Sequence, residues 1–187
     1  MITKAPRTII YDWSINKNRN RATVIILVLA CLWMLLIPWF MSPQLDPFVA
    51  RIGLGTYTLT WLLIVLGIIA IHEGLHGVFF WLYSRHLSFG VKWKTKFGPA
   101  PYATSSGRMF TKRQYQMIGF APQFLSATLL VFGIVTHDAI SALLLMAAAA
   151  NLAGGCIDIW SIYEIQRLPE NILVEDTSDG FKVWSAD

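Results

Sequence analysis

Charged residues are scarce in this sequence. Lys, Arg, Asp and Glu make up 14% of its 187 residues and 55% are hydrophobic, whereas about a quarter of a soluble domain is charged. No polar stretch exceeds roughly 30 residues, and independent folding without disulfides or metal usually needs more than ~40. The composition therefore excludes a large soluble domain and predicts one integral-membrane domain over residues 1–187.

Cysteine is nearly as rare. The two cysteines, Cys31 and Cys156, lie inside apolar segments, so a structural disulfide framework is not expected. Cys156 is two positions from Asp158 and would point to nearly the opposite face of a helix. We therefore predict that Cys156 packs as a small residue and does not bind metal.

A recognised nucleic-acid binding motif is also missing. The net charge of +4 and the pI of about 9.2 could suggest a nucleic acid. The same basic residues are explained by membrane topology and by attraction to anionic lipid headgroups. We expect the lipid bilayer as a partner, and no nucleic acid.

Four apolar runs are long enough, or nearly so, to cross about 30 Å of hydrocarbon. They cover residues 22–42, 57–83, 116–136 and 139–165. Pro122 and Gln123 interrupt the third run. The first run has no A-x-A-like exit before Ser42-Pro43, so we interpret it as a retained anchor and not as a cleaved signal peptide.

The positive charges predict the orientation of these spans, because cytoplasmic loops collect Lys and Arg. With four spans and both termini in the cytoplasm, 14 of the 15 Lys and Arg residues fall on cytoplasmic segments, and only Arg51 falls on the other side. We therefore predict a multi-pass protein of the plasma membrane with cytoplasmic N and C termini.

The polar insertion 84–115 carries strand signals. Residues 87–97 alternate apolar and polar side chains with period two, and shorter extended pieces follow at 102–104 and 108–111. This pattern predicts a cytoplasmic β-hairpin beside the helices. An irregular basic loop on the membrane surface is the alternative.

The tail 166–187 contains a second candidate hairpin. An Asp179-Gly180 turn signal separates two apolar pieces at 171–176 and 181–184, although a disordered acidic end is the alternative. The predicted fold class is an all-α membrane protein. It is a four-transmembrane-helix bundle with a small cytoplasmic β-hairpin insertion between helices two and three and a possible C-terminal hairpin.

The most informative segment is an H-E-x-x-H pattern, His72-Glu73-Gly74-Leu75-His76, in the middle of the second run. Residues four apart on a helix face the same way, about 6 Å apart along the axis, so His72 and His76 can bind one metal ion while Glu73 reaches its water. Polar side chains can also serve as glue between helices. Two His and a Glu are expensive in hydrocarbon, however, and such groups mark function.

A catalytic zinc site takes three protein ligands and leaves one position open, so a third ligand is needed. Asp158 is the only carboxylate besides Glu73 that lies well inside an apolar run. At 1.5 Å per residue, His76 and Asp158 both lie about 10 Å from the ends of their spans. The other candidates fall in loops or at the membrane rim: His86, His137, Asp138 and Glu164.

Asn151 precedes Asp158 by seven positions, so the two residues share a face if the fourth run is one continuous helix. Gly154 and Gly155 lie on the same face and would permit close approach of another helix. Asn151 would either hold a developing oxyanion or orient Asp158, and the residues leave both roles open.

This constellation resembles the putative zincin peptidase family of small integral-membrane proteins, which is distantly related to the site-2 intramembrane metalloproteases. The resemblance covers roughly residues 61–184. It rests on His72-Glu73-x-x-His76-Gly77, Tyr102-Ala103, Ala121-Pro122 and residues 151–158. The resemblance implies that His72, His76 and Asp158 bind zinc and that Glu73 is the general base.

The sequence therefore predicts a zinc-dependent, membrane-embedded metallopeptidase that hydrolyses peptide bonds of membrane or membrane-proximal substrates, with Glu73 activating a zinc-bound water. The alternative is a non-catalytic zinc-binding membrane scaffold or regulator. A small transporter with a proton relay is less favoured, because four spans without repeats leave little room for alternating access.

Overall fold

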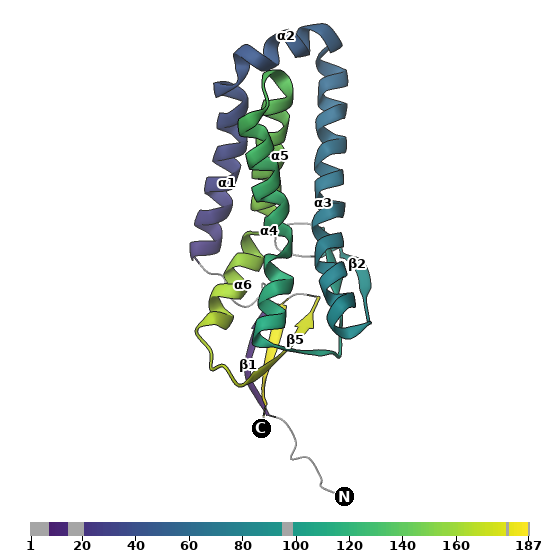
Figure 1. The fold of residues 1–187 in the computed structure, drawn as a ribbon, viewed down its shortest axis with the longest axis vertical. Helices are drawn as coiled ribbons and strands as arrows, with labels where there is room; N and C mark the ends of the chain where they lie inside the picture. The colour runs from purple at the N-terminus through teal and green to yellow at the C-terminus, as the bar shows by residue number, and fades with distance from the viewer. Residues whose placement is uncertain (1–7, 15–20, 95–98, 179, 187) are drawn as a thin grey trace, which may run out of the picture. The chain divides into compact units, whose positions relative to one another are not determined.

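The computed structural model describes residues 8–14, 21–94, 99–178 and 180–186 (Figure 1). The described residues form six helices: α1 (Arg21–Phe40), α2 (Ser42–Ile52), α3 (Leu54–Ser84), α4 (Lys112–Val135), α5 (Asp138–Gly154) and α6 (Cys156–Gln166). They also form six strands: β1 (Ile9–Ser14), β2 (Ser88–Lys92), β3 (Ala100–Thr104), β4 (Met109–Thr111), β5 (Ile172–Thr177) and β6 (Gly180–Ser185). The expectation of a mostly helical protein is confirmed, whereas the all-α class needs correction because six strands form two sheets beside the helices.

The chain divides into two compact units. The first unit consists of residues 1–20, 73–121 and 157–187, and the second of residues 21–72 and 122–156. The first unit holds both sheets, and the second holds α1, α2 and α5. The expectation of one domain over residues 1–187 stays a prediction.

Two helices, α3 and α4, are each long and apolar enough to cross a membrane. They correspond to the predicted runs 57–83 and 116–136. The fourth predicted run forms α5 and α6, which qualify as a span only when they are taken together as one bent pair. The bundle of four spans stays a prediction.

The fourth run is not the continuous helix that we expected. The helix ends at Gly154, and α6 begins at Cys156 after a turn at Gly155. Two consecutive glycines weaken a helix, because glycine has the lowest helix propensity after proline. The shared helix face predicted for residues 151–158 is therefore interrupted between Asn151 and Asp158.

The second unit packs α5 against α1 and α2. Alanines cover the buried face of α5, including Ala142 and Ala149, and they contact Ile37 of α1 and Leu45 of α2. In Figure 1, α2 follows α1 at the end where α3 begins. The sequence did not predict α2, which begins at Ser42 with a proline in its first turn, where a missing N–H is harmless.

The first unit contains a four-stranded antiparallel sheet in the order β1-β6-β5-β4. Buried and partly exposed residues alternate along β5 and β6, as expected of strands with one buried face. The core of this unit includes Phe80, Phe110, Ile165, Val174 and Phe181. The predicted C-terminal hairpin is confirmed, with Asp179 of its turn outside the described residues, whereas β1 was not predicted.

The second sheet is a hairpin of β2 and β3, with Phe89 opposite Ala103 and Gly90 opposite Tyr102. The predicted hairpin in the insertion is confirmed for residues 88–92 and 100–104, whereas 95–97 lie outside the described residues. The extended piece at 108–111 instead contains β4, which pairs with β5. A Cβ on Gly77 of α3 would lie 2.7 Å from the Phe89 ring, so Gly77 lets the hairpin approach α3 closely.

Lys112 joins the start of α4 to the end of α6. Its buried ammonium group donates hydrogen bonds to the carbonyls of Gln166 (3.2 Å) and Leu168 (2.7 Å) and to the Glu170 carboxylate (2.8 Å). The carbonyls at a helix end lack partners within the helix, so Lys112 satisfies the end of α6. This hydrogen bond lowers the pKa of the exposed Glu170 carboxyl group.

Asp176 lies on the buried face of β5, where its Oδ1 accepts a hydrogen bond of 2.9 Å from the Tyr115 hydroxyl group. Burial raises the pKa of the Asp176 carboxyl group from 3.8 to about 7, although the hydrogen bond from Tyr115 acts in the opposite direction. Between these two values the folded protein binds a proton that the unfolded chain has released. Stability is therefore greatest below the lower value and is lost as the pH rises through the upper one.

Asp176→Asn is expected to remove the loss of stability at high pH. The amide keeps an oxygen that accepts the hydrogen bond from Tyr115, and it cannot ionise. At pH 8 the variant should be more stable than the wild type by up to about 4 kcal/mol, and the two should converge near pH 4. Unfolding of detergent-purified protein, followed by tryptophan fluorescence across this pH range, measures the difference. Glu175→Gln, a change on the other face of β5, is the control, and equal pH slopes for Asp176→Asn and wild type would contradict the prediction.

Candidate metal centre

The H-E-x-x-H pattern lies on α3, as the sequence predicts. Helix geometry puts His72 and His76 on one face, one turn apart, and both imidazoles are buried. Because no β-branched run or proline interrupts α3 between these residues, the spacing of the two side chains is set by the helix itself. The two imidazoles therefore lie on the same face of α3, one turn apart.

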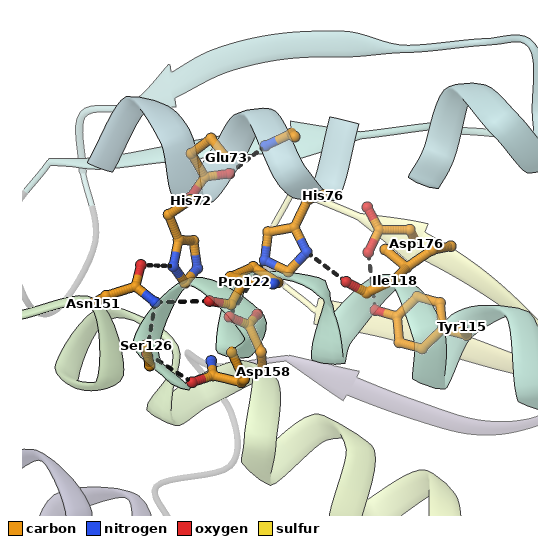
Figure 2. Close-up of polar contacts among 12 residues, drawn as sticks. His72, Glu73, His76, Tyr115, Ile118, Pro122, Ser126, Asn151, Asp158 and Asp176 are labelled. Atoms are coloured by element: carbon orange, nitrogen blue, oxygen red, sulfur yellow. Dashed lines mark hydrogen bonds and ion pairs between the residues drawn. The ribbon is translucent and has the colours of Figure 1, made fainter. Parts of the chain in front are cut away.

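Asp158 in the first turn of α6 completes the group. Its Oδ2 lies 3.3 Å from Nε2 of His76. One ligand atom from each of His72, His76 and Asp158 lies within 4.8 Å of the other two, and Figure 2 shows the three side chains together. Among the described residues, this is the one cluster of three or more potential metal-binding side chains that meets this spacing.

The donor set fits zinc. Imidazole nitrogen and carboxylate oxygen are ordinary zinc ligands, and a tetrahedral ion about 2.0–2.1 Å from each of them places ligand atoms roughly 3.3 Å apart. The 3.3 Å between His76 and Asp158 matches that separation. Three protein ligands would leave a fourth position for water, as in catalytic zinc sites. The three residues could therefore hold a zinc ion.

The proton on His76 is placed by α4. Nδ1 of His76 lies 2.9 Å from the carbonyl oxygen of Ile118, which can only accept, so Nδ1 carries the proton and Nε2 keeps its lone pair for a ligand. The Ile118 carbonyl would normally accept from the residue four positions later in its helix. That residue is Pro122, which has no N–H, so the proline leaves this carbonyl open for His76.

The proton on His72 is placed by Asn151. Nδ1 of His72 lies 3.0 Å from Oδ1 of Asn151. The Asn151 amide nitrogen donates to the Pro122 carbonyl (2.8 Å) and to the Ser126 hydroxyl group (2.7 Å). Because a carbonyl cannot donate, these contacts fix the amide orientation. His72 must then donate from Nδ1 and keep Nε2 for a ligand (Figure 2).

Asn151 is thus a partner of His72. Of the two roles that the sequence left open, an oxyanion donor would need a free amide proton, and both protons are used by Pro122 and Ser126. Its oxygen faces His72 and not Asp158. The geometry therefore favours an orienting role on the first histidine.

Glu73 lies outside the cluster of three ligands. Its Oε2 accepts a hydrogen bond of 2.7 Å from the backbone N–H of Ala103 in β3. The hairpin insertion therefore holds the Glu73 carboxylate next in sequence to His72, the first candidate ligand of the motif. The sequence did not predict the contributions of Ala103, Ile118 and Ser126; Pro122, an unusual residue for a helix interior, was the one available signal.

The other residues that the sequence offers as candidate ligands lie outside this cluster. His86 is exposed beyond the end of α3, and His137 and Asp138 are exposed at the start of α5. Glu164 of α6 accepts a hydrogen bond from the Tyr11 hydroxyl group at 3.3 Å. None of these four belongs to the ligand cluster.

No curated protein and no solved structure matches this chain. One family model does match, over residues 65–173, and its description is "Putative zincin peptidase". The match covers more than half of the 187 residues and includes the H-E-x-x-H pattern, Pro122, Asn151 and Asp158. A relationship to site-2 proteases stays a prediction. The chain belongs to the putative zincin peptidase family, whose description indicates a zinc metallopeptidase.

Proposed function

We propose that this protein is a membrane-embedded zinc metallopeptidase that hydrolyses peptide bonds of membrane or membrane-proximal substrates. The observation that carries the proposal is the convergence of His72, His76 and Asp158, each in an apolar helix, with Glu73 next in sequence to His72. Such groups are rare in membrane helices unless they have a function. The family match supports the same chemistry.

The reaction is the addition of water to a peptide bond. A zinc ion held by His72, His76 and Asp158 would polarise the scissile carbonyl and lower the pKa of a water molecule toward ~7. Glu73 takes one proton from the attacking water while the water oxygen bonds to the carbonyl carbon. Glu73 then passes this proton to the departing nitrogen as the C–N bond breaks, so the products are a carboxylic acid and an amine.

The hairpin insertion supplies a place for an extended substrate. Among the described residues, β3 pairs only with β2, and the Ala103 N–H on β3 bonds to Glu73. In an antiparallel pair of strands, a backbone N–H that does not bond to the partner strand points to the unpaired edge of its own strand. A peptide that unwinds and joins this edge as a strand would pass beside Glu73.

The four-stranded sheet supports four spans. A sheet with free edges does not lie in hydrocarbon, so β1, β4, β5 and β6 belong at one membrane surface. Because these strands lie at the same surface, the chain between β1 and β4 must cross the membrane an even number of times. The same holds for the chain between β4 and β5. If α3 and α4 cross, then α1 and the α5–α6 pair must cross as well. The positive charges favour a cytoplasmic position for this surface and for both termini.

Zinc removal and return test the proposed function. Purified protein should hold about one zinc ion and should cleave at least one protein in membranes from cells that lack it. Chelation should abolish the cleavage and added zinc should restore it, with new peptide ends identified by terminal-selective mass spectrometry. Zinc-loaded protein that cleaves no membrane protein would instead support the alternative, a non-catalytic zinc-binding scaffold or regulator.

A further inference from the structure

Gln123 on α4 carries a buried hydrogen-bond donor that is not used. Among the described residues, none accepts a hydrogen bond from its Nε2 atom, which is shielded from solvent. Buried polar groups are nearly always paired, and an unpaired one indicates strain or a functional role. The hydrogen bonds around the Gln123 amide favour a functional role over strain.

A chain of hydrogen bonds sets the orientation of the Gln123 amide. The Pro122 carbonyl and the Ser126 hydroxyl oxygen both accept from Asn151. Ser126 therefore has its own proton to donate, and its Oγ lies 3.4 Å from Oε1 of Gln123, which makes a weak hydrogen bond. The amide oxygen of Gln123 thus faces Ser126, and the nitrogen with its two protons is the atom left open.

The open nitrogen lies beside the first metal-binding histidine. A Cβ built on Gly155 would lie 2.0 Å from Nε2 of Gln123 and 3.2 Å from Cε1 of His72. Nε2 of Gln123 and Cε1 of His72 therefore lie close to each other, on the same side of Gly155. Cε1 is bonded to Nε2 of His72, the nitrogen that is left for a ligand. The absence of a side chain at Gly155 leaves room for the Gln123 amide in this position.

We propose that the Gln123 amide donates a hydrogen bond to the carbonyl oxygen of the peptide bond under attack and stabilises the negative charge that develops on it. This inference rests on the proposed peptidase function. A buried donor without a partner among the described residues suits such a site, since no existing hydrogen bond must break when the charge appears. Asn151 cannot take this role, because both of its amide protons are engaged.

The test uses purified protein loaded with cobalt(II) in place of zinc, and acetohydroxamate as the probe. The two probe oxygens bind a metal, and its carbonyl oxygen takes the position of the substrate carbonyl. Cobalt absorption bands report both the intact site and probe binding. Gln123→Leu should keep its cobalt and bind the probe about 10- to 100-fold more weakly, as expected when a hydrogen bond to a charged group is lost. Gln123→Glu, which keeps the shape without the donor, should also bind weakly.

Gln44→Leu is the matched control. Gln44 of α2 is another partly buried glutamine with one buried unpaired amide atom, in its case the oxygen, and its replacement should leave probe affinity unchanged. Unchanged affinity in Gln123→Leu, or loss of its cobalt, would overturn the inference. Wild-type protein that holds cobalt but binds no probe would contradict the proposed function itself. With a cleavable substrate, Gln123→Leu should lower kcat by about 10²–10³-fold and leave KM nearly unchanged.

Discussion

Glu73→Gln is expected to abolish peptide-bond cleavage while the protein keeps its zinc. Glu73 is not one of the three candidate ligands, so its replacement should leave zinc binding intact. Glutamine has the same shape, and its amide oxygen can still accept the hydrogen bond from Ala103. It cannot take a proton from water. Loss of a general base lowers a rate by about 10²–10⁴-fold, which is the expected reduction in kcat.

The measurements are zinc content by mass spectrometry and the rate of product formation from an identified membrane substrate. Glu164→Gln is the matched control, because it makes the same chemical change on α6 at a carboxylate that bonds to Tyr11. This control should retain full activity. Cleavage by Glu73→Gln at the wild-type rate would show that another group activates the water, and zinc loss would show that Glu73 supports the ion.

Asp158→Ala is expected to remove zinc from the protein. The substitution leaves two imidazoles and no negative charge among the ligands, and it removes the oxygen that lies 3.3 Å from His76. The zinc affinity should fall by more than the roughly 10–100-fold typical of changes to residues that only orient a ligand. His76→Ala should have an effect of the same size. Competition with a chromogenic chelator measures both affinities.

Two further variants calibrate this result. Asn151→Leu keeps all three ligands but removes the hydrogen bond that orients His72, so its affinity should fall by only about 10–100-fold. Asp46→Ala removes an exposed carboxylate from α2 and should have no effect. Full zinc retention in Asp158→Ala would mean that the third ligand is another residue.

The cluster of candidate ligands could be predicted from the sequence because helix geometry is local. The spacing of His72 and His76 follows from the helical repeat alone, and apolar surroundings made Asp158 the best remaining carboxylate. The sequence also places Asp158 at the depth of His76, and the two side chains lie 3.3 Å apart, although the premise of an unbroken fourth helix was wrong. The break at Gly155 did not separate Asp158 from His76.

The missed features depend on contacts between distant parts of the chain. β1 was not predicted, because its strand partner β6 lies at the other end of the chain. An extended piece at 108–111 was predicted, but its pairing as β4 with β5 was not, since local pattern does not identify a distant strand partner. Pro122 was visible in the sequence but was interpreted as an interruption of the third span. Its role follows from the N–H that it lacks and from the open Ile118 carbonyl that bonds to His76, which requires knowing which helix lies beside it.

The pairing of β1 with β6 has a consequence for biogenesis. The ribosome makes β1 before the first helix, yet the strand that it pairs with follows the sixth helix. β1 cannot pair with β6 until nearly the whole chain has been synthesised. Because β6 and β5 also form the core against Phe80 and Ile165, a nascent chain stopped before Gly180 would leave the surroundings of Asp158 unfinished. The candidate metal centre would therefore be completed only late in synthesis, after β6 has been made.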